Sequence, residues 1–260
     1  MTMRTDLSRL PALGAPAQMS NALAGFLRAT HALLPTVGVY LYGSLARGAY
    51  RPPASDVDIL IVTSSSTPEA VISEVRAALA AARAHGARVD AIVATRDQVA
   101  GSALPAALDV VFPPDAEPQR CAGNRGMMFP LDRQDVWECG VSLFGVPARE
   151  VIPPAPTEML HASLAWTFPH LARHFKNPEL MLCRATHVFL EGRLCSKPEA
   201  GRWALVVFDP RWHGTIEAAL ASREEGQTQQ VCSPEELDGF QRTCADLIEG
   251  ATGVRVHTHP

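Results

Sequence analysis

Hydrophobic positions in the first 112 residues follow two different periods. Residues 19–35 repeat apolar side chains every three or four positions, with Leu23, Phe26 and Leu27 on one side, which predicts an amphipathic helix. The segment 57–63 (VDILIVT) is apolar almost throughout, which is typical of a strand buried on both faces. The same patterns predict strands at 37–43, 87–95 and 107–112, a short helix over 44–50 with Ser44 as its N-cap, and a helix over 67–86 capped by Thr67.

The pattern changes beyond residue 112. Residues 113–157 are irregular and rich in Pro and Gly, although 135–147 predicts a helix and then a short strand. From 157 onward, five segments have helical character. We therefore predict an α+β protein: a mixed β-sheet with helices in residues 1–152, followed by a C-terminal α-helical bundle in residues 153–260.

Composition narrows the class of protein. The 260 residues are 47% hydrophobic and carry a net charge of −4, whereas a dedicated nucleic-acid binder usually has a basic excess. No apolar run is long enough for a membrane span, and the first 30 residues lack a secretory pattern. The six cysteines form no C-x-x-C pair, which is typical of free thiols in a reducing compartment. We expect a cytoplasmic monomer with no membrane or nucleic-acid partner.

Two acidic residues open the strand at 57–63. Asp56 and Asp58 point the same way because side chains alternate along a strand, so their charges repel unless a cation lies between them. Two carboxylates close together suit Mg²⁺, which also takes phosphate oxygens and water. Upstream, Gly43 allows close approach of a ligand, and Ser44 with nearby backbone N–H groups could bind a phosphate. This combination indicates phosphoryl or nucleotidyl transfer from a metal-bound nucleotide.

A third acid, Asp90, lies in the otherwise apolar segment 87–95. An acid is costly there unless it is paired, so Asp90 could complete the metal site or act as the base for an attacking hydroxyl. A D-x-D pair alone is common and could simply end a loop. Gly-Ser, a loop, D-x-D before a buried strand, and an acid in the next strand form a far more specific pattern.

Other basic and aromatic residues are weaker candidates. Arg47, Lys197 and Arg211 could contact the phosphates of a nucleotide, or they could be solvated surface residues. Trp166 and Trp203 could stack on a ligand, but their apolar surroundings favour core packing. His170 and His174 are four residues apart on a predicted helix, but no third metal ligand is spaced nearby.

The stretch YGSLARGAYRPPASDVDILIV (residues 42–62) resembles the signature of the nucleotidyltransferase superfamily that includes DNA polymerase β. Residues 140–152 (GVSLFGVPAREVI) and 182–205 (LCRATHVFLEGRLCSKPEAGRWAL) are similar to segments of the streptomycin/spectinomycin adenylyltransferase family. The resemblance covers roughly residues 20–225.

The resemblance implies AMP transfer from Mg-ATP to a hydroxyl of an aminoglycoside or aminocyclitol antibiotic. It also implies roles for five residues. Ser44 and Ser55 would contact phosphate, Asp56 and Asp58 would hold Mg²⁺, and Asp90 would match the family's base, which is a glutamate at or beside this place.

One segment departs from the family pattern. Drug-modifying members supply acidic side chains from the segment that here contains Pro198 and Arg202, and an arginine would repel a cationic drug. Either other acids take over or the acceptor is not a standard aminoglycoside. Two further alternatives are a regulatory or antitoxin-like protein with this fold, and a polynucleotide substrate. The acids that could take over the contact with a cationic drug are Glu191, Glu199, Asp115 and Glu117.

Overall fold

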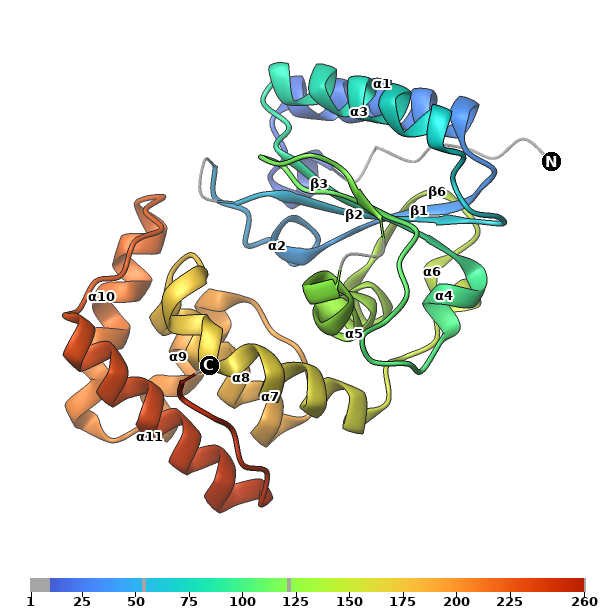
Figure 1. The fold of residues 1–260 in the computed structure, drawn as a ribbon. Helices are drawn as coiled ribbons and strands as arrows, with labels where there is room; N and C mark the ends of the chain where they lie inside the picture. The colour runs from blue at the N-terminus through green and yellow to red at the C-terminus, as the bar shows by residue number, and fades with distance from the viewer. Residues whose placement is uncertain (1–9, 53–54, 121–122, 260) are drawn as a thin grey trace. The chain divides into compact units, whose positions relative to one another are not determined.

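The computed structural model describes residues 10–52, 55–120 and 123–259. These residues form two compact units, one of 10–50 with 55–155 and one of 51–52 with 156–259. The first contains a mixed sheet with helices, and the second is helical, which confirms the predicted fold class (Figure 1). No helix among the described residues is long and apolar enough to cross a membrane.

The N-terminal unit is built on a six-stranded sheet with the order β5-β4-β3-β2-β1-β6. Only β2 and β3 pair in parallel, and the other neighbours are antiparallel. The strands are β1 (Thr36–Tyr42), β2 (Val57–Thr63), β3 (Val89–Thr95), β4 (Val110–Phe112), β5 (Gln119–Arg120) and β6 (Val141–Gly145).

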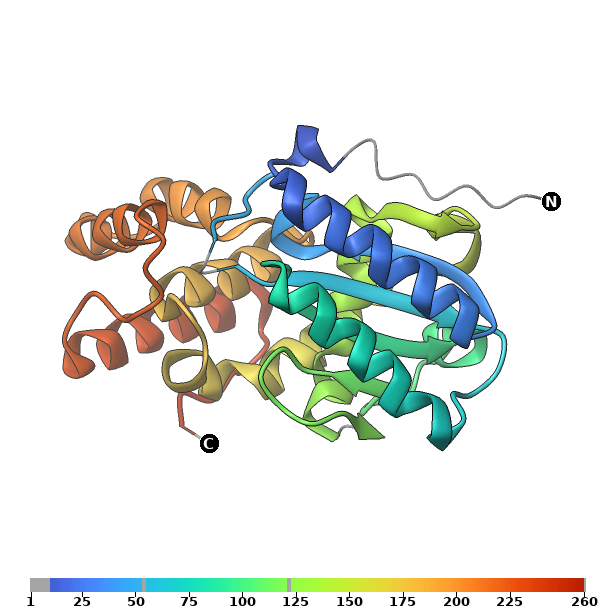
Figure 2. The same cartoon turned by 90° about the horizontal axis from the view of Figure 1, so that it is seen from above.

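Helices cover both faces of this sheet (Figures 1 and 2). One apolar core lies under α1 and α3 and contains Val39, Ile59 and Val93. The other lies under α4, α5 and α6 and contains Tyr40, Leu60 and Ile92, as alternation along each strand requires. The helices are η1 (Pro11–Leu13), α1 (Ala17–Leu33), α2 (Gly43–Ala46), α3 (Glu69–Ala84), α4 (Arg96–Ala100), α5 (Gly123–Cys139) and α6 (Ala148–Val151).

In the C-terminal unit α8 is central, because α7, α9, α10 and α11 all contact it. Most of the α8 side chains are buried, which explains why its sequence is apolar on several sides. The elements are α7 (Thr157–His174), α8 (Pro178–Glu191), α9 (Lys197–Val207), η2 (Pro210–Trp212), α10 (His213–Glu224) and α11 (Pro234–Thr252).

Two predicted helix caps are wrong. The helix α2 begins at Gly43 with Tyr42 at the N-cap, so Ser44 lies inside the first turn. The N-cap of α3 is Pro68 in an extended conformation, and the backbone N–H of Thr67 instead donates to the buried Asp109 carboxylate at 2.6 Å. In both places tertiary contacts override the local capping signal.

The helix predicted within 135–147 is also longer than expected. It begins at Gly123 and ends at Cys139, followed by β6. Arg133, Gln134 and Asp135 are buried polar residues on α5, so hydrophobic periodicity does not mark its full length.

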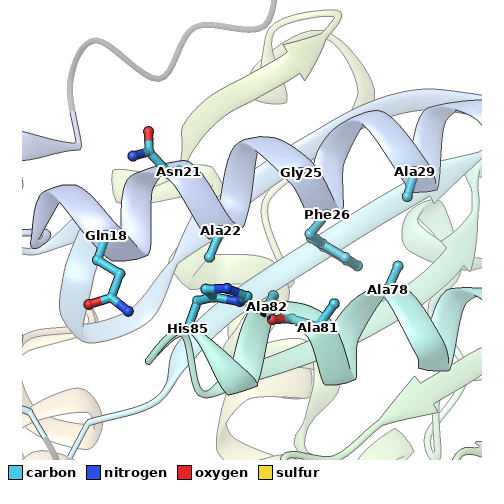
Figure 3. Close-up of a pocket in the computed structure, with 10 residues that line it drawn as sticks. All are labelled: Gln18, Asn21, Ala22, Gly25, Phe26, Ala29, Ala78, Ala81, Ala82 and His85. Carbon is cyan, nitrogen blue, oxygen red and sulfur yellow. Dashed lines mark hydrogen bonds between the residues drawn. The ribbon is translucent and has the colours of Figure 1, made fainter.

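A groove of small residues lies between α1 and α3, lined by Ala22, Gly25, Ala29, Ala78 and other residues (Figure 3). Its lining contains no carboxylate, arginine or lysine. It belongs to the helices on the face of the sheet opposite α5, so the groove does not contain the predicted aspartates.

Candidate active site

Asp58 and Asp90 lie side by side on the sheet. The parallel register of β2 and β3 pairs Val57 with Val89 and Asp58 directly with Asp90. Both carboxylates point to the face covered by α5, because Leu60, two residues after Asp58, belongs to the core on that face. Two acids separated by 32 residues are thus brought together by the one parallel strand pair of the described sheet.

Burial sets the electrostatics of this pair. Desolvation, reinforced by the charge of Asp90, raises the pKa of Asp58 well above its ordinary value. Burial also raises the pKa of Asp90, although the nearby Arg125 guanidinium acts in the opposite direction. Two carboxyl groups held in one low-dielectric place need added positive charge to be ionised together.

Gly43 approaches Asp58 more closely than any other residue type could. Its φ of 70° lies in the left-handed region, and a Cβ at this position would come 2.0 Å from Oδ2 of Asp58. The backbone N–H of Gly43 donates to Oδ2 of Asp135 at 3.0 Å. The glycine therefore lets the turn before Ser44 lie directly against the Asp58 carboxylate.

Arg125 supplies a cation beside the acidic pair. Its Nη2 lies 3.2 Å from Oδ2 of Asp90, and its Nε lies 3.6 Å from Oδ2 of Asp132. Nη2 also donates to the Tyr42 hydroxyl at 3.4 Å. Burial acts against the charge on Arg125, but Asp132 and the other acidic groups outweigh it and raise the pKa. Asp90 is therefore oriented by an arginine on α5.

Replacing Arg125 with Met should leave Asp90 and Asp132 partly buried without their cation. We expect the free energy of unfolding to fall by about 3 kcal/mol, the lower end of the range for a broken buried pair, because the three side chains keep 15–22% exposure. Urea denaturation measures this loss. Arg76→Met, which breaks an exposed pair with Glu117, is the control and should cost less than about 1 kcal/mol. Equal losses in the two variants would contradict a structural role for Arg125.

Asp56 lies just before β2 and has 24% side-chain exposure. Nε of Arg88 donates to Oδ1 of Asp56 at 2.5 Å, and the same arginine pairs with Asp115. Ser55 is buried beside it. Arg88 thus provides local positive charge for the first aspartate of the D-x-D pair.

The three basic candidates have other partners within their own units. Nε of Arg47 donates to Oδ1 of Asp135 at 2.6 Å, and its Nη2 lies 2.9 Å from Oε2 of Glu138. In the C-terminal unit, Nζ of Lys197 donates to a backbone carbonyl at 2.5 Å. Nη2 of Arg211 donates to the Thr243 hydroxyl at 3.3 Å. Their contacts with a nucleotide stay predictions.

The segment that departs from the family pattern has a structural explanation for two residues. Pro198 lies in the first turn of α9, where its missing N–H costs nothing. Glu199 forms a capping box with Ser196 at the same turn. Arg202 is exposed on α9. The start of α9 therefore explains Pro198 and Glu199. It does not explain Arg202, whose exposed positive charge could meet an acceptor.

The other acids and aromatics proposed for acceptor binding have protein partners. Oε1 of Glu191 accepts from the Trp203 indole at 3.0 Å. Trp203 also packs edge-on against His187, as core packing predicts. On the sheet unit, Asp115 pairs with Arg88 and Glu117 with Arg76.

His170 and His174 are neighbours on α7, with ring centroids 5.9 Å apart. Within the part of the chain that the structure describes, no group of three or more His, Cys, Asp or Glu side chains could hold a metal ion, and this includes the predicted trio Asp56, Asp58 and Asp90. The described cysteines are free thiols, and Cys121 lies outside the described residues.

The chemistry around Asp58 and Asp90 fits a hard divalent cation. Oδ1 of Asp90 is buried, with no hydrogen-bond partner among the described residues. A cation would satisfy that oxygen and would offset the burial and the charge of Asp90, which together raise the pKa of Asp58. Mg²⁺ usually takes one or two carboxylates and completes its shell with phosphate oxygens and water, so the donors are of the right kind.

Sequence reasoning missed the residues that support this site from α5. Arg125, Asp132, Asp135 and Glu138 are spaced by seven, three and three positions, which places them on one side of a helix. That spacing could have indicated the helix, but only if the helix had been recognised from its polar residues instead of its apolar ones. Arg88, immediately before β3, was missed for a different reason, because nothing in the sequence links it to Asp56.

Two family models match the chain. The nucleotidyltransferase domain model matches residues 23–105, and the model of the aminoglycoside adenylyltransferase C-terminal domain matches residues 150–246. None of the curated proteins compared matches the sequence significantly. The resemblance seen in the sequence is therefore confirmed for each half of the chain.

Among solved structures, the chain is similar to the spectinomycin adenyltransferase AAD(9) from Enterococcus faecialis, crystallised with ATP and spectinomycin. The TM-score is 0.70 at 14% sequence identity, over 89% of this chain and 98% of that chain. At this identity the likeness shows a shared fold.

Proposed function

We propose that this nucleotidyltransferase, whose C-terminal domain is of the aminoglycoside adenylyltransferase type, transfers AMP from ATP to a hydroxyl of an aminoglycoside or aminocyclitol. The observation that carries the proposal is the in-register pair Asp58 and Asp90, which lies against the Gly43–Ser44 turn. Spectinomycin is the first acceptor to test, because the structurally similar AAD(9) was crystallised with it.

In the proposed reaction, an acceptor hydroxyl oxygen attacks the α-phosphorus of ATP. The bond from that phosphorus to the bridging oxygen of the β-phosphate breaks, and pyrophosphate leaves. Asp90 takes the hydroxyl proton, and burial favours this role because it raises the pKa of the carboxyl and so makes its carboxylate a stronger base. Arg125 keeps Asp90 oriented while the proton moves.

Asp56 and Asp58, with Asp90 beside them, would hold Mg²⁺. When bound, the ion supplies positive charge that neutralises the phosphate oxygens of ATP. Ser44 and Ser55 are proposed to contact the phosphates from the N-terminal unit, because Ser44 follows the glycine that lies against Asp58 and Ser55 immediately precedes Asp56.

Lys197 and Arg211 are the proposed phosphate contacts from the C-terminal unit. Both are cationic side chains near the start of a helix. Nζ of Lys197 donates to the backbone carbonyl of Lys176, and Nη2 of Arg211 donates to the Thr243 hydroxyl, so both cations contact neutral oxygens. If a phosphate oxygen replaced the neutral acceptor, each cation would form a stronger, charge-assisted hydrogen bond.

The test is pyrophosphate release from Mg-ATP with spectinomycin, streptomycin and other aminoglycosides as acceptors. We expect release with at least one drug, together with a product whose mass increases by one adenylyl group. Because Arg202 is exposed, a hydroxylated acceptor without cationic groups should be included as the rival class. Pyrophosphate release only with the uncharged acceptor would show that the substrate is not an aminoglycoside or aminocyclitol drug. Failure to bind Mg-ATP would overturn the proposed AMP transfer itself.

A further inference from the structure

The Gly43–Ser44 turn is held in place by a side chain from α5. Oδ2 of Asp135 accepts the Gly43 backbone N–H at 3.0 Å. Its other oxygen accepts from Nε of Arg47 at 2.6 Å, and Glu138 lies 2.9 Å from Nη2 of the same arginine. One carboxylate thus connects the beginning of α2 to the residue that follows it.

The turn depends on such external support. With four residues, α2 is far too short to be stable alone, because helix nucleation is unfavourable. Its N-cap residue, Tyr42, makes no side-chain capping bond. Asp135 is 3% exposed, so its bonds to Gly43 and Arg47 are shielded from water and strong.

We propose that Asp135 is a positioning residue for the nucleotide, and that Arg47 acts through Asp135 rather than on a phosphate. By fixing the Gly43 N–H and Arg47, Asp135 sets the direction of Ser44 and keeps the turn against Asp58. The guanidinium of Arg47 is directed to two carboxylates, Asp135 and Glu138, which satisfy its charge within the N-terminal unit. This inference rests on the proposed function, since it assigns a role in binding ATP.

The experiment measures the Kd of Mg-ATP, by calorimetry without any acceptor, for the wild type and for Asp135→Asn and Asp135→Ala. The asparagine keeps an acceptor for the Gly43 N–H but loses the charge, so Kd should rise about tenfold, and the alanine should raise it further. With spectinomycin as acceptor, the KM for ATP should rise in the same order while the KM for spectinomycin changes less than about twofold.

Asp109 provides a matched control at the other end of the sheet. It is also a buried aspartate that accepts a backbone N–H, from Thr67, and pairs with an arginine, Arg120. Asp109→Asn should lower stability as much as Asp135→Asn but leave the Kd of Mg-ATP within about twofold of the wild type. A purely structural role for Asp135 would reduce only the active fraction, with both KM values unchanged, and that result would overturn the proposal.

A double-mutant cycle tests the role of Arg47. If Arg47 acts through Asp135, then Arg47→Gln with Asp135→Asn should weaken Mg-ATP binding no more than Asp135→Asn alone. Fully additive losses would mean that Arg47 contacts the nucleotide directly and would overturn this part. If the wild type itself does not bind Mg-ATP, the proposed function fails; if it binds and the Asp135 variants bind equally well, only this inference fails.

Discussion

Asp58→Asn is expected to abolish AMP transfer while making the protein more stable. The loss of activity should be at least on the order of 10²–10³-fold, as for removal of one preorganised charge-stabilising group. The gain in stability follows because burial and Asp90 both oppose the charge on Asp58. An uncharged amide of the same shape avoids that cost, so the unfolding midpoint at pH 7 should rise by about 2–4 °C for each kcal/mol released.

The pH dependence gives this prediction a definite sign. Because the pKa of Asp58 is raised in the folded state, the folded protein holds the proton more tightly than the unfolded chain does. Below the unfolded pKa of about 3.9 both states are protonated, and the wild type and Asp58→Asn should be equally stable. As the pH rises from there through the folded pKa, the wild type loses stability relative to the variant.

Thermal unfolding followed from pH 4 to pH 8 measures this difference. Asp109→Asn is the matched control, because Asp109 is buried but paired with Arg120, so its replacement should lower the midpoint instead. Mg-ATP should raise the midpoint of the wild type more than that of Asp58→Asn, since binding to the folded state stabilises it. A variant that is less stable than the wild type at pH 7, or that keeps near-normal activity, would contradict the role assigned to Asp58.

The part of the site that the sequence predicted is the part encoded by short spacing. The D-x-D pattern made Asp56 and Asp58 candidates through strand alternation, and a lone acid in an apolar strand made Asp90 a candidate. In the structure Asp58 and Asp90 lie within β2 and β3, whereas Asp56 lies just before β2. The side-by-side position of Asp58 and Asp90 depends on one further fact, the parallel register of β2 and β3. The strand order follows from packing across the whole sheet, so no local pattern contains it.

The support from α5 could not be predicted in the same way. Asp135 is 88 residues from Arg47 and 92 from Gly43, so only the folded chain brings them together. Charge alone indicated a phosphate contact for Arg47, because a lone arginine after a Gly-Ser turn has no visible partner. The hydrophobic pattern of α5 was also obscured, since several of its buried positions are polar.

Gly43→Ala is expected to remove activity through geometry rather than charge. A Cβ at this position would come 2.0 Å from Oδ2 and 2.8 Å from Cγ of Asp58, so the carboxylate must rotate away. The left-handed backbone, with φ of 70°, adds about 1–2 kcal/mol of strain for any residue with a Cβ. Since Asp58 is proposed to hold Mg²⁺, its displacement should lower kcat/KM for ATP by about 10² or more.

Gly48→Ala separates the two contributions. Gly48 has nearly the same backbone conformation, with φ of 66°, but a Cβ there would meet nothing within 4 Å. It should therefore show the loss of about 1–2 kcal/mol in urea denaturation and keep most of the AMP transfer activity. If Gly43→Ala and Gly48→Ala lose activity equally, backbone strain alone is enough to explain the loss. The close approach of Gly43 to Asp58 would then have no role in the reaction. Loss confined to Gly43→Ala would mean that the turn and the carboxylate act as one unit.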